Sequence, residues 1–150
     1  MSLNQKVALI TGAGQGIGAA IVQRLAEEGC KLILVDINTK QIDILSKQLD
    51  QQNVENIPMT VDVTIKIEIE RAIAQAVKRW GTIHILVNNA GIIRDGFISN
   101  ISEQDWDQVL DVNLKAAFLC CQALFPIMKQ QQSGKIVNIV SRAWLGNIGQ

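Results

Sequence analysis

Short apolar runs alternate along the chain with longer segments in which apolar residues recur every three or four positions. The Ile, Val and Leu content of each run is nearly continuous, which is typical of strands buried on both faces of a parallel sheet. The runs predict five strands, over residues 6–10, 31–35, 57–61, 83–88 and 135–140.

Helical periodicity fills the intervals between these runs and predicts helices over residues 15–28, 39–52, 69–80 and 102–129. Gly29 and Gly81 follow the first and third helices, where glycine commonly ends a helix, and Ser102 can cap the fourth. The alternation predicts one α/β dinucleotide-binding domain over residues 1–150. We expect a Rossmann-type doubly wound parallel sheet in three αβα layers, truncated after the fifth strand.

The amino-acid composition of the chain limits the kinds of molecule that it is expected to bind. Hydrophobic residues make up 48% of the chain and the formal net charge is zero, so no basic excess favours nucleic acid or an anionic membrane surface. The longest apolar runs have five or six residues and the N-terminus lacks a signal-peptide core, so we expect no bilayer-spanning segment and a cytoplasmic protein. We therefore expect a small-molecule partner.

The cysteine and histidine residues, which often bind metals in proteins, form no recognisable metal-binding motif in this sequence. The three cysteines, Cys30, Cys120 and Cys121, have no metal-ligand spacing, and we expect reduced thiols without a chemical role. The one histidine, His84, has no partner that the sequence identifies, and we interpret it as structural.

A glycine-rich run, from Thr11 to Gly18, follows the first predicted strand and opens the first helix. The start of a helix carries unpaired N–H groups and partial positive charge, and glycines let a pyrophosphate approach the backbone closely. The run matches T-G-x-x-x-G-x-G without substitution, whereas G-x-G-x-x-G fits only with Ala19 in place of its last glycine. It predicts a dinucleotide site; a strand-to-helix turn without a ligand is the alternative.

Asp36 ends the second predicted strand, eighteen residues beyond Gly18, where the adenosine ribose of a dinucleotide would lie. A carboxylate there accepts hydrogen bonds from the ribose hydroxyls, and it would repel a 2′-phosphate by roughly 4 kcal/mol per charge pair at ~4 Å and an effective dielectric of ~20. Gln15 cannot pair with that phosphate as a cation could. These residues favour NAD over NADP; an ordinary turn aspartate is the alternative for Asp36.

These motifs resemble the short-chain dehydrogenases/reductases over the whole chain. The glycine run matches the family's cofactor motif, Asn88 to Gly91 matches its N-N-A-G, and Asp62 matches its aspartate after the third strand. The resemblance implies that Asp62 and Val63 hold the adenine, and for Asn88 and Asn89 the alternative is that their amides only tie strands together. It also implies that the remaining cofactor contacts come from Gly12, Gln15, Gly16, Ile17, Gly18, Asp36, Asn89, Ala90 and Gly91.

Two polar residues are candidates for catalysis. Asn113 falls on an otherwise apolar helical stripe, so we expect a buried amide that needs a polar partner. The resemblance implies that Asn113 bends its helix and holds a water of a proton relay; a structural asparagine bonded to nearby backbone is the alternative. Ser141 matches the family serine that hydrogen-bonds the substrate oxygen, although a turn serine is the alternative.

The sequence departs from the family pattern because it contains no tyrosine. The family's catalytic Y-x-x-x-K normally follows the serine, and the chain given ends at Gln150. A positioned acid contributes roughly 10²- to 10⁴-fold to the rate. We therefore expect this chain to bind cofactor weakly and to catalyse little, as a fragment or as half of a split reductase.

Within the family, residues 88–95 and 146–150 most resemble bacterial 3-oxoacyl-acyl-carrier-protein reductases. That resemblance implies hydride transfer between a nicotinamide and a carbonyl or hydroxyl of a small-molecule or acyl-carrier-bound substrate. Two alternatives remain: a non-catalytic dinucleotide-binding module, and an oligomerisation element in which the helix from Ser102 docks on a symmetry mate. The family resemblance implies a homodimer or homotetramer.

Overall fold

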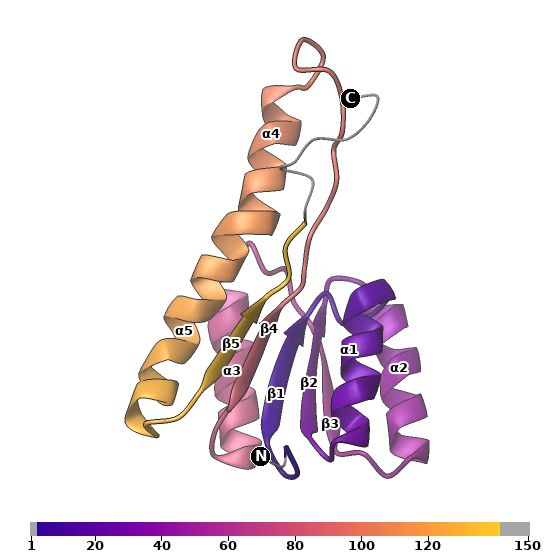
Figure 1. The fold of residues 1–150 in the computed structure, drawn as a ribbon, viewed down its shortest axis with the longest axis vertical. Coiled ribbons are helices and arrows are strands. Elements are labelled where there is room, and N and C mark those ends of the chain that lie inside the picture. The colour runs from indigo at the N-terminus through magenta and orange to yellow at the C-terminus, as the bar shows by residue number, and fades with distance from the viewer. Residues whose placement is uncertain (1–2, 142–150) are drawn as a thin grey trace.

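The computed structural model describes residues 3–141 (Figure 1). Within them, one parallel sheet has the strand order β3-β2-β1-β4-β5. Its order reverses beside β1, since the chain moves outward from β1 to β3 and then returns to pair β4 with β1. All five predicted strands are present, with bounds that shift by up to two residues. They are β1 (Val7–Thr11), β2 (Lys31–Asp36), β3 (Asn56–Thr60), β4 (Ile85–Asn88) and β5 (Lys135–Asn138).

The helices lie between the strands as the periodicity predicts. Gly29 and Gly81 have φ of +79° and +80° beside the ends of α1 and α3, which confirms both stops. Ser102 accepts a hydrogen bond from the Asp105 N–H at 3.0 Å, which confirms the cap of α4. The helices are α1 (Gly16–Glu27), α2 (Thr39–Gln51), α3 (Lys66–Trp80), α4 (Glu103–Leu110), the π-helical turn η1 (Asp111–Lys115) and α5 (Ala116–Gln130).

Helices cover both faces of the sheet, so the domain has three layers (Figure 1). Successive strand residues point to opposite faces, and the two faces therefore build two separate apolar clusters. Ile10 belongs to the cluster under α1 and α2, whereas its neighbour Leu9 belongs to the cluster under α3 and α5. Both side chains are almost fully buried, and this burial fixes the carboxyl ends of the strands relative to one another.

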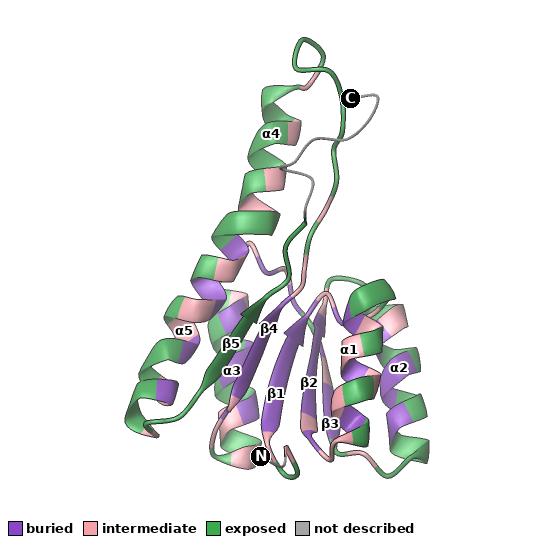
Figure 2. Cartoon of the chain, viewed as in Figure 1, coloured by how far each residue is buried: buried purple, intermediate pink, exposed green. Residues whose placement is uncertain are grey.

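β5 differs from the other strands because all four of its residues are exposed (Figure 2). It pairs with β4 along one side, and Ile136 and Val137 remain 41% and 46% exposed. β5 is therefore an open, apolar edge of the sheet within the described residues. The expectation of strands buried on both faces is wrong for β5, because all four of its residues remain exposed.

α4, η1 and α5 join into one continuous helix, Glu103–Gln130. Its 28 residues are long and apolar enough, by length and composition only, to cross a membrane. This corrects the expectation that no segment is long and apolar enough to span a bilayer. That expectation counted uninterrupted apolar runs, whereas a helix can place the interrupting polar residues on a different face from the apolar ones. Leu119, Cys120 and Leu124 of α5 pack into the core beside α3, whereas α4 extends beyond the sheet (Figure 1).

Candidate functional site

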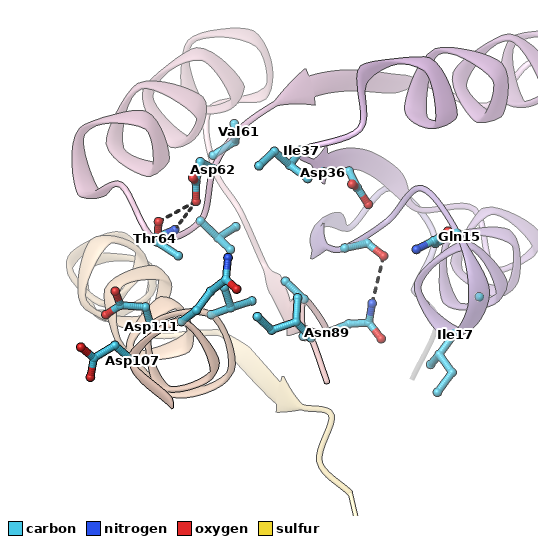
Figure 3. A pocket seen from close by; sticks show the side chains of 18 of the residues that line it. Gln15, Ile17, Asp36, Ile37, Val61, Asp62, Thr64, Asn89, Asp107 and Asp111 are labelled. Carbon is cyan, nitrogen blue, oxygen red and sulfur yellow. Dashed lines mark hydrogen bonds between the residues drawn. The ribbon is translucent and has the colours of Figure 1, made fainter. Parts of the chain in front are cut away.

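A cavity of about 1000 Å³ lies at the carboxyl ends of β1, β2, β3 and β4. This is the edge where parallel α/β sheets bind ligands, beside the point at which the strand order reverses. Gly12, residues 15–17 and residues 36–37 form one side of it, residues 61–64 lie across from them, and residues 89–92 also line it (Figure 3). The strand ends therefore bring together segments that are far apart in the sequence.

The glycine run forms a tight turn into α1. Gly12 and Gly16 have φ of +62° and +53°, a region that glycine adopts without the strain of a Cβ. A Cβ on Gly18 would overlap the carbonyl oxygen of Gly12 and lie 2.6 Å from Asn89 Nδ2. Gly18 therefore packs against the turn and does not line the cavity, whereas Gly16 and Ile17 at the start of α1 do.

Asn89 and Thr11 hold this turn against the end of β4. The Asn89 side-chain amide donates to the carbonyl oxygens of Thr11 and Gly12 at 3.1 and 3.0 Å (Figure 3). The Thr11 hydroxyl accepts from the N–H groups of Asn89 and Ala90, both at 3.0 Å. Asn88 instead donates to Asn138 Oδ1 at 2.8 Å across β4 and β5. Both asparagine amides thus tie strands together, and Asn89, Ala90 and Gly91 also line the cavity.

Asp36 lies at the cavity rim, where its carboxylate is already oriented by backbone donors. Oδ2 accepts from the Gly14 N–H and Oδ1 from the Asn38 N–H, each at 2.9 Å. A carboxylate oxygen has two lone pairs, so each keeps an acceptor site for a further donor. Asp36 can therefore hold a vicinal diol without giving up its contact with the glycine turn.

Asp62 and Val63 lie on the opposite side of the cavity, after the end of β3. Asp62 Oδ1 accepts from the Thr64 N–H at 2.9 Å and from the Thr64 hydroxyl at 2.7 Å (Figure 3). The Asp62 N–H donates to Glu68 Oε2 at 2.8 Å. These bonds fix the loop between β3 and α3 at the cavity.

Asn113 is exposed, so the expectation of a buried amide is wrong. It lies in the π-helical turn, in the part of the long helix that extends beyond the sheet. Its Oδ1 accepts from the Ile92 N–H at 2.8 Å, and its Nδ2 donates to the Ile92 carbonyl at 3.0 Å. The contacts are those of the structural alternative, and they hold the segment after β4 at the cavity wall.

Ser141 is exposed beyond the end of β5 and is not one of the residues that line the cavity. The structure therefore does not bring it together with the glycine turn and Asp36. The segment 146–150, part of the resemblance to acyl-carrier-protein reductases, lies outside the described residues.

One wall of the cavity comes from α4 and η1, which the sequence did not single out. Polar side chains recur there every four residues, and Figure 3 shows Asp107 and Asp111 on this wall. That spacing was the available signal, because it places a polar stripe on one helix face. Among residues 3–141, no group of three metal-binding side chains could hold a metal ion. The wall consists of Glu103, Gln104, Asp107, Gln108, Asp111 and Val112.

Known proteins agree with this geometry. A family profile described as short chain dehydrogenase matches residues 6–148. The chain is 38% identical to (2S)-[(R)-hydroxy(phenyl)methyl]succinyl-CoA dehydrogenase subunit BbsD of Thauera aromatica, covering 100% of this chain and 60% of that protein. It is 40% identical to 3-oxoacyl-[acyl-carrier-protein] reductase FabG of Thermotoga maritima, covering 100% and 61%. The chain thus spans about 60% of the length of these relatives.

Solved structures give the same result. A short-chain dehydrogenase/reductase from Burkholderia xenovorans superposes with a TM-score of 0.93 at 38% identity, over 99% of this chain and 61% of that one. Another, from Burkholderia phymatum and solved in complex with NAD, superposes with a TM-score of 0.93 at 32% identity, over 97% and 52%. The chain belongs to the short-chain dehydrogenase family.

Proposed function

We propose that this chain is the dinucleotide-binding part of an NAD(P)-dependent oxidoreductase that transfers hydride between a nicotinamide and a carbonyl or hydroxyl group. The single observation that carries the proposal is the cavity bounded by the glycine turn on one side and Asp36 on the next strand. The cofactor, when bound, supplies the hydride chemistry; the chain binds and orients it.

The residues at the cavity fit the parts of a dinucleotide. Gly16 and Ile17 would place backbone N–H groups at the pyrophosphate, because only a glycine at position 18 lets the turn close this tightly. Asp36 would accept from the adenosine ribose hydroxyls. Asp62 and Val63 would hold the adenine, and residues 89–91 would pass beneath the cofactor.

We propose NAD as the favoured cofactor. The Asp36 carboxylate faces the place where NADP carries its 2′-phosphate, and two like charges there repel. The neutral Gln15 lines the same side and brings no cation to offset the phosphate charge. The related Burkholderia phymatum protein was solved with NAD, in line with this choice.

For the reaction, we propose that Ser141 binds the substrate oxygen and that Asn113 serves the proton relay. The chain contains no tyrosine, so by itself we expect little or no turnover. The two relatives named above have a coenzyme A or acyl-carrier-protein group in their names. A carrier-linked acyl chain is therefore our proposed substrate class. A non-catalytic dinucleotide-binding fragment, or half of a split reductase, is the second candidate, since the missing tyrosine favours it.

Calorimetric titration with NAD⁺ and NADP⁺ tests the binding function without needing turnover. We expect NAD⁺ to bind more tightly than NADP⁺, and Asp36→Ala to shrink that preference by about tenfold or more, because the repelling carboxylate is gone. Asp43→Ala, at an exposed position of α2 away from the cavity, is the matched control. The proposal fails if neither dinucleotide binds, or if the preference is unchanged in Asp36→Ala.

We also propose that the chain forms a homodimer or homotetramer through its long helix. Leu114, Phe118 and Phe125 are 65%, 58% and 60% exposed along it. Monomeric proteins seldom leave so many large apolar side chains exposed on one helix, and a second copy would cover them.

A further inference from the structure

We infer that Gln41 is a positioning residue of the nucleotide site, which acts by holding the Gln15 side chain in the orientation that binds the adenosine ribose. The inference rests on the proposed dinucleotide function. Gln41 does not line the cavity, so any effect on the ligand must pass through a residue that does.

Gln41 is held by one hydrogen bond from its backbone and one from its side chain. It lies in the first turn of α2, where its N–H donates to the capping Asn38 Oδ1 at 3.3 Å. From the side chain, Gln41 Nε2 donates to Gln15 Oε1 at 3.1 Å. The bond joins the first turn of α2 to the residue that precedes α1, across 26 positions of sequence.

Gln41 also packs on the glycine turn. A Cβ on Gly14 would lie 2.9 Å from Gln41 Cβ, 3.2 Å from Gln41 Oε1 and 3.1 Å from Asp36 Oδ2. Only a residue without a side chain therefore lets Gln41 and Asp36 approach the turn together. Gly14, which binds Asp36 through its N–H, is thus enclosed by the two side chains.

The bond determines which end of the Gln15 amide is available to a ligand. Gln15 is exposed and its side chain does not cap α1, so the start of the helix does not fix the orientation of its amide. With its oxygen engaged by Gln41, Gln15 presents its two Nε2 N–H donors instead. Figure 3 shows Gln15 beside Asp36, with its side-chain nitrogen turned toward the cavity.

A donor from Gln15 next to acceptors from Asp36 suits a ribose diol, because each hydroxyl both donates and accepts. Without Gln41, the Gln15 amide could rotate and present its oxygen beside the Asp36 carboxylate. Two acceptors would then compete for the same hydroxyl protons, and the ligand oxygens would lose a donor. We therefore expect Gln41 to raise affinity for the ribose without contacting it.

ADP-ribose is the probe, since it carries the adenosine ribose and pyrophosphate without the reacting ring. Its dissociation constant is measured by calorimetry for the wild-type chain, Gln41→Met, Gln15→Ala and the double variant. Methionine keeps the length and packing of Gln41 but removes the donor. Gln48→Met, at an exposed position of the same helix, is the matched control.

We expect Gln41→Met and Gln15→Ala each to weaken binding by about threefold to tenfold, the worth of one hydrogen bond. The double variant should be no weaker than Gln15→Ala alone, because both changes remove the same contact. Thermal midpoints should stay equal to the wild type, and Gln48→Met should bind normally. The shorter side chain of Gln41→Asn cannot reach Gln15, so this variant should behave like Gln41→Met.

The inference is overturned if Gln41→Met binds ADP-ribose as the wild type does, or if the two effects multiply in the double variant. It is also overturned if the loss of affinity merely follows a lowered thermal midpoint. A wild-type chain that binds no ADP-ribose overturns the proposed function and this inference with it. Normal wild-type binding with no effect at position 41 overturns the inference alone.

Discussion

Gly18 shows how one missing Cβ shapes the nucleotide site. In Gly18→Ala, the new methyl group would overlap the Gly12 carbonyl, so the turn must open. We expect a loss of roughly 1–3 kcal/mol in the free energy of unfolding, as for other overpacked sites, together with weaker dinucleotide binding. Urea denaturation measures the first and calorimetry the second. Gly96→Ala is the control, since its methyl would meet only Ile101 Cγ1 at 3.4 Å. Equal stability of the two variants would contradict this account.

His84 is a structural residue, in line with its interpretation from the sequence. Its Nδ1 accepts the Val7 N–H at 3.0 Å, a bond that only the unprotonated nitrogen can make. Burial, and secondarily the charge of Lys6, lowers the pKa of His84 below its usual 6.5. His84 directly precedes β4, so its imidazole links the start of β4 to the start of β1.

This lowered pKa predicts a pH dependence of stability. The unfolded chain takes up the proton at a higher pH than the folded chain does, so folding is favoured by deprotonation. The contribution is complete above about pH 6.5 and is lost as the pH falls from there through the lower folded pKa. Urea denaturation measures the free energy of unfolding, which should fall between about pH 7.5 and pH 5.5 in the wild-type chain. The fall should be smaller in His84→Gln, which removes the chain's one histidine. An identical decline in both proteins would assign it to other groups.

At the scale of the element, α4 depends on its cap more than the other helices do. Its residues include none that is buried, so packing contributes little to hold it. The Ser102 hydroxyl accepts from the Asp105 N–H and donates to Asp105 Oδ2 at 2.6 Å. Removing such a cap costs about 1 kcal/mol.

We therefore expect Ser102→Ala to loosen α4 locally and to leave global stability nearly unchanged. Amide hydrogen exchange over Glu103–Leu110 should become about fivefold faster, which corresponds to that cost. Ser99→Ala, in the preceding loop, is the control and should leave exchange unchanged. A large drop in the urea midpoint of Ser102→Ala would instead mean that α4 unfolds together with the core.

The sequence was sufficient for features that depend on local chemistry. Gly29 and Gly81 end helices because glycine accepts positive φ, and the strands follow from apolar runs, which are mostly buried in β1 to β4. The exposure of Asn113 could not be predicted, because it depends on whether the sheet reaches that part of the helix. The wall from α4 and the contact of Gln41 with Gln15 likewise depend on how separate elements approach in space.

At the scale of the whole molecule, the exposed phenylalanine side chains of α5 lie outside the cavity. The cavity opens at the carboxyl ends of the strands, between the glycine turn and α4. Phe118 and Phe125 lie on α5 and do not line the cavity. Assembly through α5 would therefore leave the nucleotide site open, so association and nucleotide binding can be tested separately.

An oligomer that forms through the long helix predicts a specific response to charge. Burying an unpaired carboxylate in an apolar interface is costly, so Leu114→Asp or Phe118→Asp should lower the mass of the assembly in solution. Sedimentation velocity or light scattering measures that mass. Both side chains are more than half exposed, so the substitutions should leave the fold intact. Phe118→Asp, which lies on α5 outside the cavity wall, should also leave ADP-ribose binding intact. Ile44→Asp, at a 59% exposed position on α2, should leave the mass unchanged. A monomeric wild-type chain, or an unaltered mass in both helix variants, would exclude this interface.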